Sequence, residues 1–335
     1  MQGTDDPSLR VNDPLLAPRL APDFVERLAH GIHVVDTGFH RPLFDASYLI
    51  VERGRAAFVD AGTNHSVPRL LAALAGAGLD TADVDYVIAT HVHLDHAGGV
   101  GLLMQQLPRA RLVVHPRGAR HLARPAQLIK SATSVYGAAE IERSYGTLVP
   151  VASERMVTTQ DGMTIELAGR PLRFLHTPGH AMHHHCIWDA ASRGFFTGDT
   201  FGLSYRDFDT ADGAWIMPTT TPVQFQPEAL RRSIERMVAL DPEWIYATHY
   251  GRVGDVPRLA VTLLAQLDEM VAFARTTSRG PERHRALLDG LEAIHLRSLR
   301  AHGVTLNDDR IRELLALDLE LNAQGIAIWL DRLSA

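Results

Sequence analysis

The chain has 335 residues, of which 46% are hydrophobic and 21% are charged, a balance typical of water-soluble globular proteins with a sizeable core. The formal net charge of −6 argues against nucleic acid as a partner, because phosphate binding requires a basic surface. No apolar run approaches the roughly 20 residues of a membrane helix, and the polar, proline-rich start of the chain does not resemble a signal peptide. Together with a single cysteine, Cys186, these features predict a cytoplasmic protein.

An irregular arm of residues 1–30 is predicted to end in a short amphipathic segment at 24–28. After it, alternating apolar residues and turn signals predict an α/β body. The predicted strands cover residues 32–38, 47–54, 55–62, 84–91, 111–116, 163–169, 171–179, 183–190, 193–200 and 243–249. The predicted helices cover residues 66–77, 96–108 and 227–239, with short helices around His121 and Ser134. Residues 47–54 and 55–62 are expected to form a hairpin.

Two segments differ from this alternation of strands and helices. Residues 201–226 have little periodicity but many aromatic side chains, which predicts a long ordered loop. From Asp255 onward, leucines recur at helical spacing in three stripes. We therefore predict an α/β domain at 1–254 followed by a helical extension at 255–335. The stripes would bury apolar faces either as a lid over a site or as a homodimer interface.

Histidine is unusually abundant, with 18 residues, and it is concentrated in two short segments. Three histidines lie between His91 and His96, and five lie between His176 and His185. Imidazole and carboxylate groups are ligands that zinc, iron and manganese accept in proteins. The two clusters, which also contain aspartate, therefore predict a metal site.

Residues of metal-ligand type end or directly follow four of the apolar runs: His91, His180, Asp199 and His249. Because strands of a layered α/β fold deliver side chains to one rim at their carboxyl ends, we expect these four residues to meet. The first of these runs continues through a turn to His93, Asp95 and His96. Four ligand-type residues in this one segment are too many for a single tetrahedral ion, which predicts two adjacent ions that share a water.

The segment His91-Val92-His93-Leu94-Asp95-His96 resembles the H-x-H-x-D-H signature of the metallo-β-lactamase-fold hydrolases. Supporting motifs occur in the family's order: FVDAG (58–62), HTPGH (176–180), FTGDT (196–200) and ATHYG (247–251). The resemblance covers about residues 30–252 and implies a four-layer αββα sandwich, to which the C-terminal helical extension is added. Within the family the chain is most similar to the glyoxalase-II-like branch. The loop after Asp199 departs from that branch, so glutathione recognition is not implied.

The resemblance also implies a set of site residues. It assigns His91, His93 and His180 to a first metal ion and Asp95, His96 and His249 to a second, with Asp199 bridging both. Asp95 is in addition the candidate catalytic residue, which would protonate the leaving group. Asp60 would orient a ligand histidine, or alternatively would serve as a turn residue at a strand end. His184 is a candidate pocket or supporting residue, and Tyr205 or Tyr250 could donate a hydrogen bond to an oxyanion.

This combination implies a hydrolase in which a metal-bridging hydroxide attacks the carbonyl of a small ester, thioester or lactone. Zinc is the first choice for the two divalent ions, with iron or manganese as alternatives. Three other functions stay open at this point: a mononuclear iron persulfide dioxygenase, a β-lactam hydrolase and a metal-dependent binding or sensor module. Specificity is expected to depend on residues 37–47, residues 201–226 and the helical extension.

Overall fold

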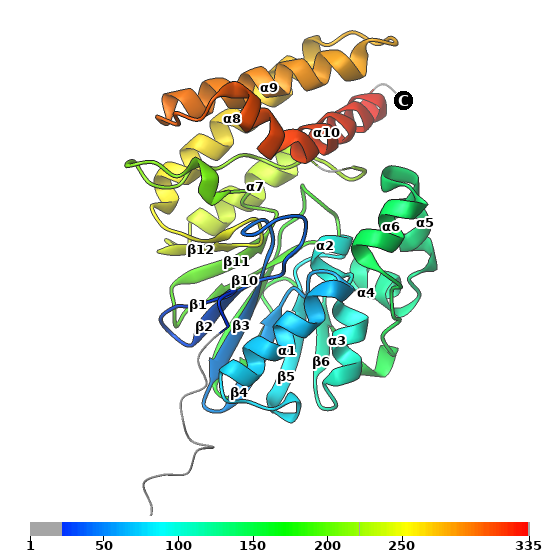
Figure 1. The fold of residues 1–335 in the computed structure, drawn as a ribbon, viewed down its shortest axis with the longest axis vertical. Helices are drawn as coiled ribbons and strands as arrows, with labels where there is room; N and C mark the ends of the chain where they lie inside the picture. Colours follow the sequence, from blue (N-terminus) through cyan, green and yellow to red (C-terminus); the bar gives the residue numbers. More distant parts are fainter. Residues whose placement is uncertain (1–21, 221, 334–335) are drawn as a thin grey trace, which may run out of the picture.

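The computed structural model describes residues 22–220 and 222–333, which form two mixed β-sheets flanked by helices (Figure 1). Sheet A has the strand order β1-β2-β3-β4-β5-β6-β7, and sheet B has the order β13-β12-β11-β10-β9-β8. The strands of sheet A are β1 (Val25–Arg27), β2 (Ile32–Asp36), β3 (Ala46–Glu52), β4 (Arg55–Val59), β5 (Val84–Ala89), β6 (Arg111–Val114) and β7 (Met156–Thr158). The strands of sheet B are β8 (Thr164–Leu167), β9 (Arg170–His176), β10 (His185–Asp189), β11 (Gly194–Gly198), β12 (Trp244–Ala247) and β13 (Gly251–Val253).

The helices follow the strands in an α/β pattern and then continue alone to the end of the described chain. They are α1 (Val67–Gly76), α2 (Leu94–Ala97), α3 (Val100–Gln106), α4 (Pro116–Ala123), α5 (Ala126–Tyr136), α6 (Ala138–Tyr145), α7 (Pro227–Val238), α8 (Val256–Thr276), α9 (Arg283–Ala301) and α10 (Asp308–Leu333). The predicted α/β fold with a C-terminal helical extension is therefore confirmed.

Successive side chains of a strand point to opposite faces of its sheet, so sheet A can pack against helices on one face and against sheet B on the other. In β3, Tyr48 and Ile50 belong to the apolar cluster between the sheets, whereas Leu49 belongs to the cluster shared with α1 and α3. Strand β4 follows the same rule, with Val59 in the first cluster and Phe58 in the second. Each such side chain stabilises the fold by about 1.5–3 kcal/mol when it is fully buried. Sheet A is thus apolar on both faces and is covered on both.

Strand direction determines where the loops with ligand-type residues lie. Strand β10 pairs antiparallel with both β9 and β11, and β11 pairs parallel with β12. Strands β9, β11 and β12 therefore run in one direction, and their carboxyl ends meet at one edge of sheet B. The loops that leave this edge carry His180, Asp199 and His249. In sheet A, the loop after β5 carries His91 and the residues that follow it.

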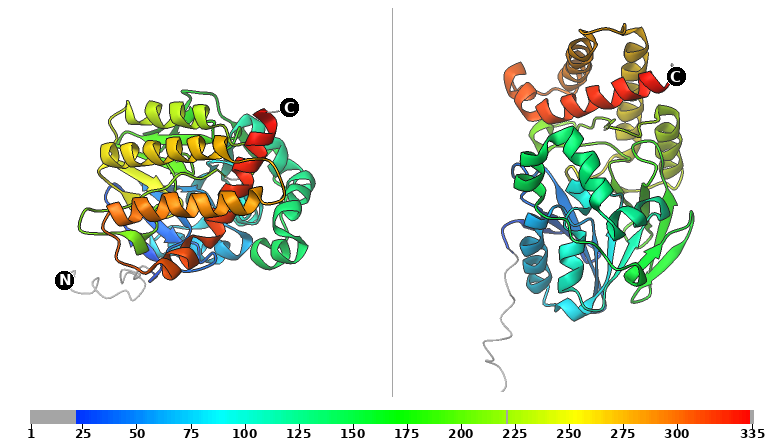
Figure 2. Two further views of the ribbon diagram at one scale, coloured as in Figure 1. Left: turned by 90° about the horizontal axis from the view of Figure 1, so that it is seen from above. Right: turned by 90° about the vertical axis from the view of Figure 1, so that its right-hand side faces the viewer.

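The helices α8, α9 and α10 form a cap at one end of the sandwich, with α10 next to the α/β body (Figures 1 and 2). Leu263 of α8 and Leu291 of α9 belong to the same apolar cluster as the residues between the sheets. The loop after β11 is part of this contact, because the indole Nε1 of Trp215 donates a hydrogen bond to Ser298 Oγ at 2.9 Å. The three helical stripes are thus confirmed, and they bury their faces within this chain. The domain boundary near 254 and a homodimer through these helices stay predictions.

Several local expectations differ from the structure. Residues 1–21 of the predicted arm lie outside the described residues, and the short amphipathic segment predicted at 24–28 contains the edge strand β1, which pairs with β2. The helix predicted at 96–108 is divided into α2 and α3, because the amide of Gly99 donates its hydrogen bond to the carbonyl oxygen of Gly62 at 2.8 Å and not to a carbonyl within the helix. The ambiguous residues 117–150 contain most of α4 together with α5 and α6.

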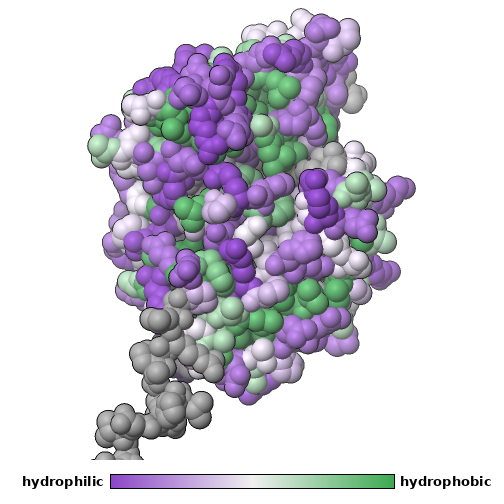
Figure 3. All heavy atoms as spheres, in the orientation of Figure 1, coloured by the Kyte–Doolittle hydropathy of each residue, from purple (hydrophilic) through white to green (hydrophobic). Residues whose placement is uncertain are grey.

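The surface carries hydrophilic residues interspersed with smaller hydrophobic groups on the face shown in Figure 3. The exposed large hydrophobic residues of the described chain are far apart in sequence: Leu43, Val223, Val261 and Leu333. None of the described helices is both long and apolar enough to cross a membrane.

Candidate metal centre

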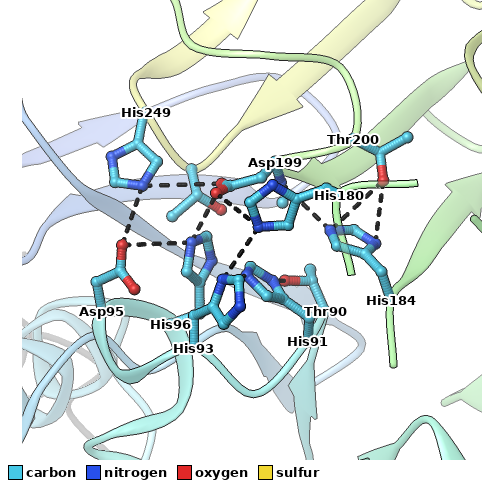
Figure 4. Close-up of polar contacts among 12 residues, drawn as sticks. Thr90, His91, His93, Asp95, His96, His180, His184, Asp199, Thr200 and His249 are labelled. Carbon is cyan, nitrogen blue, oxygen red and sulfur yellow. Dashed lines mark hydrogen bonds and ion pairs between the residues drawn. The ribbon is translucent and has the colours of Figure 1, made fainter. Parts of the chain in front are cut away.

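The loops at the carboxyl ends of β5, β9, β11 and β12 bring histidine and aspartate side chains into two adjacent groups (Figure 4). The first group contains His91, His93, His180 and Asp199, and the second contains Asp95, His96 and His249. In each group, one potential ligand atom from every residue lies within 4.8 Å of the others. The structure therefore brings together all the residues that were predicted from the sequence as metal ligands, and it divides them in the predicted way.

The first group is held by three imidazoles whose nitrogens converge. Nδ1 of His93 lies 2.9 Å from Nε2 of His91 and 3.0 Å from Nε2 of His180. In a tetrahedral zinc site, ligand atoms about 2.0–2.1 Å from the ion are roughly 3.3 Å from one another. The convergence of the three nitrogens is thus close to what one metal ion requires.

The carboxylate of Asp199 faces both groups with different oxygen atoms. Its Oδ2 lies 3.4 Å from Nε2 of His180 in the first group. Its Oδ1 lies 3.1 Å from Nε2 of His96 and 3.7 Å from Nε2 of His249 in the second group. A carboxylate in this position can supply one oxygen to each of two ions.

Nε2 of His96 and Oδ1 of Asp199, which face each other at the centre, are buried without a hydrogen-bond partner, as is Nδ1 of His180, the ring nitrogen on the side away from the other ligands. Buried polar atoms are nearly always paired, and an unpaired one costs about 1–3 kcal/mol. A bound cation would accept the lone pairs of Nε2 of His96 and Oδ1 of Asp199. The donor set, the spacing and these unpaired atoms together are consistent with a dinuclear metal site.

Residues behind the two groups fix the orientation of their imidazole rings. The Asp60 carboxylate lies 2.8 Å from Nδ1 of His96 and accepts further hydrogen bonds from the Thr90 backbone and from the hydroxyls of Thr90 and Thr248. Nδ1 of His249 lies 2.9 Å from the carbonyl oxygen of Phe44. Since Nδ1 is engaged in both rings, Nε2 of both faces the metal centre. The position of Asp60 matches its predicted role, whereas the threonines had not been predicted.

His184 contacts the backbone of Asp199, the residue whose carboxylate faces both groups. Its Nε2 accepts a hydrogen bond from the amide of Asp199 at 3.3 Å, so its proton is on Nδ1, which lies 3.0 Å from Thr177 Oγ1. Of the neighbouring histidines, His185 points elsewhere and lies 2.9 Å from Thr159 Oγ1, whereas Nδ1 of His183 accepts from the Val92 amide and its ring centroid lies 5.6 Å from that of His93. The predicted position of His184 beside the ligands agrees with this contact.

The imidazoles of the first group favour the neutral form that binds cations. Burial, together with the neighbouring imidazoles of His96 and His93, lowers the pKa of His91 well below its ordinary value. Burial and the adjacent His180 likewise lower the pKa of His93 to about 3. Because a metal ion competes with protons for these nitrogens, a low pKa leaves them free to bind one near neutral pH.

The second group has a different charge balance, because carboxylates surround it. Burial opposes protonation of His96, but the charges of Asp199, Asp95 and Asp60 outweigh it and raise the pKa of His96 well above its ordinary value. For His249, burial is likewise outweighed by the hydrogen bond to Asp95 and the charge of Asp199, which raise its pKa to about 9. This excess of negative charge is suited to a cation, which can take the place of the protons.

The two candidate tyrosines do not line the cavity beside the metal centre. Tyr205 is buried, and its hydroxyl donates a hydrogen bond to Asp318 Oδ1 at 3.2 Å. Tyr250 is also buried, and burial raises the pKa of its hydroxyl above the ordinary value. Their role as donors to an oxyanion stays a prediction.

A cavity of about 370 Å³ opens beside the metal centre, where Asp95, Asp199 and His249 form part of its wall. The remaining wall comes from four segments that are distant in sequence. The loop after β2 contributes Phe39, His40 and Phe44, helix α6 contributes Glu140, Arg143 and Tyr145, the loop after β11 contributes Leu203 and Thr219, and helix α10 contributes Leu317, Asp318, Glu320, Leu321 and Gln324. All three segments expected to determine specificity, residues 37–47, residues 201–226 and the helical extension, line this cavity, whereas the contribution of α6 was not predicted.

Asp318 is the least expected of these residues. It occupies a buried position on α10 beside Leu314, Leu315 and Leu319, and together with Asn322 one turn further on it is a polar interruption of a buried face that is otherwise apolar. A charged residue within an apolar stripe is rare unless it has a partner or a function. This interruption of the stripe was the signal in the sequence by which Asp318 could have been recognised.

Comparisons with known proteins agree with this geometry. The sequence profile of the metallo-beta-lactamase superfamily matches residues 40–249. The metallo-beta-lactamase fold-containing protein ST1585 of Sulfurisphaera tokodaii is 26% identical over 242 residues, which are 71% of this chain and 84% of that protein. A hydroxyacylglutathione hydrolase of Aeromonas hydrophila is 27% identical over 212 residues, which are 62% of this chain and 63% of the hydrolase. Among solved structures, the metallo-beta-lactamase family protein TTHA1429 of Thermus thermophilus has a TM-score of 0.64 at 22% identity and covers 91% of this chain and 94% of its own.

Proposed function

The chain belongs to the metallo-beta-lactamase superfamily, and from its two groups of histidine and aspartate we propose that it is a dinuclear metal-dependent hydrolase of a small ester, thioester or lactone. The observation that carries the proposal is the position of Asp199, whose two oxygens face the two groups separately. A complete second group also favours two ions over one, because a mononuclear site would not need Asp95, His96 and His249 to converge.

Two bound divalent ions would supply a water acidic enough to act as a nucleophile near neutral pH, and would polarise a carbonyl oxygen. The chain's own contribution is to hold and orient the ligands. His91, His93 and His180 would hold the first ion, and Asp95, His96 and His249 the second. Asp60 holds His96 in the tautomer that leaves Nε2 free for a cation, because its carboxylate accepts a hydrogen bond from the Nδ1–H group.

Asp95 is the residue that we assign to proton transfer. Its carboxylate lines the cavity, its side chain is 24% exposed, and its Oδ2 lies 3.3 Å from Nε2 of His249. A carboxylate at the boundary between the ligands and the cavity can hold the proton that a departing alcohol or thiol takes up. This position distinguishes Asp95 from Asp199, which is 6% exposed.

The cavity supports a small substrate with both apolar and polar parts. Phe39, Phe44 and Leu203 offer apolar contacts, while the carboxylates lie close to the metal centre and on α10. The similarity to a hydroxyacylglutathione hydrolase supports acyl-transfer chemistry of this kind. We propose small molecules as the partners of the protein and zinc as its metal, since histidine and carboxylate ligands suit zinc.

The test is metal content followed by turnover. Purified protein is analysed for zinc, iron and manganese per chain, and the metal-loaded protein is assayed with matched thioester, ester, lactone and β-lactam substrates. Two ions per chain with hydrolysis of a thioester, ester or lactone above that of the His249→Ala variant support the proposal. One iron per chain with oxygen consumption on a persulfide, or no hydrolysis by fully loaded protein, would overturn it.

A further inference from the structure

The cavity contains one buried carboxylate oxygen that the metal centre does not use. Asp318 of α10 is 8% exposed, lines the cavity together with Asp199 and His249, and has an Oδ2 that is buried without a hydrogen-bond partner. An unpaired buried carboxylate oxygen destabilises the fold by about 1–3 kcal/mol, or more when it is charged. A group that enters the cavity can satisfy it.

The position of Asp318 relative to the metal centre is fixed by a short chain of contacts. Its Oδ1 accepts a hydrogen bond from the hydroxyl of Tyr205 at 3.2 Å. The ring of Tyr205 stacks on that of Phe44, with 5.2 Å between the centroids. The carbonyl of Phe44 in turn lies 2.9 Å from Nδ1 of the candidate ligand His249. Tyr205 thus occupies one oxygen of Asp318 and leaves the other for a ligand.

The two other acidic side chains on the wall away from the metal centre are already engaged. Glu140 accepts hydrogen bonds from Arg143 and from Ser144. Glu320 accepts from Gln324 at 2.6 Å and lies 3.1 Å from Nε2 of His284. Among these three acids, Asp318 is therefore the one with an oxygen free to contact a substrate.

The chemistry of a buried carboxyl restricts the group that it can contact. Burial raises the pKa of Asp318 to about 7 in the absence of metal ions, whereas cations at the nearby centre would favour its ionised form, so the form present depends on the charge held there. An ammonium group would pair only with the ionised form, and a carboxylate only with the neutral form. A hydroxyl or a carboxamide carries both a donor and an acceptor, so it can bond to Oδ2 in either form.

We propose that Asp318 is a specificity-determining residue whose Oδ2 binds an uncharged donor–acceptor group of the substrate, a hydroxyl or a carboxamide, while the reacting carbonyl lies at the metal centre. The neighbouring Leu317 and Leu321 of α10 line the same cavity and would contact the carbon chain between the two. The inference rests on the proposed function for the identity of the reacting group. The helical extension would then take part in substrate selection.

The test measures binding, so that it does not depend on turnover. Metal-loaded protein is titrated by calorimetry with butanoate, 4-hydroxybutanoate, succinamate, 4-aminobutanoate and succinate, and with their five-carbon and six-carbon homologues. At each chain length, the five compounds differ only in the terminal group at the end opposite the carboxylate. We expect the hydroxyl or the carboxamide compound of one chain length to bind about tenfold more tightly than the methyl compound, the effect of one hydrogen bond to a buried group.

The variants assign this preference to Asp318. Asp318→Leu is expected to abolish it, and Asp318→Asn, which keeps a donor and an acceptor, is expected to retain part of it. Asp309→Asn removes an exposed acid from the same helix and should bind as the wild type does. Thermal unfolding of each variant shows whether α10 is still packed, and only folded variants are compared.

Three outcomes would overturn the inference: equal affinity of wild type for the methyl and polar compounds, tightest binding of a charged compound, or an unchanged preference in folded Asp318→Leu. Failure of the proposed function is recognised separately. In that case the loaded wild type would show the preference in binding but would hydrolyse none of the corresponding thioesters, esters or lactones.

Discussion

The carboxylate of Asp60 lies 2.8 Å from Nδ1 of His96, on the opposite side of the ring from Nε2, which faces Asp199 at 3.1 Å. Asp60 is fully enclosed and accepts hydrogen bonds from Thr90 and Thr248 as well. Strands β4, β5 and β12, from both sheets, are thus linked through one carboxylate directly behind a candidate ligand. The orientation of His96 depends on this network and not on His96 alone.

Replacement of Asp60 by asparagine should therefore weaken the second metal site selectively. We expect the affinity for the more weakly held ion to fall about 10–100-fold, the usual effect of losing a residue that orients a ligand histidine. The affinity of the site built by His91, His93 and His180 should change little. Competition with a chromophoric chelator resolves the two binding steps. Thr248→Ser, which keeps the hydroxyl that donates to Asp60, is the matched control, and unchanged binding of both ions by Asp60→Asn would contradict the prediction.

Single ligand replacements should remove the ions one at a time. We expect His249→Ala to hold one ion per chain through the first group, and His180→Ala to hold one through the second. Asp199→Ala should weaken both sites, because the carboxylate faces both groups. Elemental analysis of protein equilibrated with limiting metal gives the stoichiometry. A wild type that holds one ion per chain, together with a His249→Ala variant that keeps this ion and full activity, would favour a mononuclear site and would contradict a dinuclear hydrolase.

Four of the ligands could be predicted from the sequence because they end or closely follow an apolar run, whereas the roles of His93, Asp95 and His96 were implied by the resemblance of their segment to the H-x-H-x-D-H signature. A strand that is buried on both faces gives a clear signal, and its end fixes where the next polar side chain lies. His91, His180 and His249 are all of this kind. Asp60 was recognisable for the same reason, since it follows β4.

The wall of the cavity could not be predicted in this way. The hydrogen bond between Tyr205 and Asp318 joins residues that are 113 positions apart, and the sequence around either residue does not indicate that the other is its partner. The apolar stripes of the extension show that its helices bury one face, but the surface that covers this face is decided by packing across the whole chain. Helix α6 was missed because its periodicity is short and mostly polar. The residues that line the cavity, on which the proposed substrate specificity depends, could therefore be identified only from the structure.

Packing of the extension against the body can be tested through one leucine. Leu291 of α9 is fully buried and belongs to the cluster that includes the residues between the sheets. Leu291→Ala should lower the free energy of unfolding by about 2–5 kcal/mol, the cost of a cavity in a packed core. Val261→Ala in α8 is the matched control, because Val261 is 70% exposed and its truncation should cost about 0.5 kcal/mol or less. Equal, small effects in urea denaturation would show that the extension is not part of the cooperative core.

A buried histidine in the same extension predicts a pH dependence of stability away from the metal centre. His295 is fully buried, its Nδ1 lies 2.9 Å from Gln266 Oε1, and its Nε2 has no hydrogen-bond partner. Burial lowers the pKa of His295 from 6.5 to about 4. Between these two values the unfolded chain binds a proton that the folded protein excludes, so stability is lost as the pH falls through this window.

The expected contribution of His295 is a loss of up to about 1.4 kcal/mol for each pH unit between pH 6.5 and about 4. Replacement by phenylalanine keeps a ring against Trp215 and removes the titration, although it leaves Gln266 Oε1 without its donor. That lost hydrogen bond should lower stability by the same amount at every pH. Urea denaturation of metal-free wild type and His295→Phe at several pH values isolates the titration, since all other groups are shared. The stability of the wild type relative to the variant should decline towards acid, and a difference that does not change with pH would mean that His295 binds its proton equally well in the folded and unfolded chain.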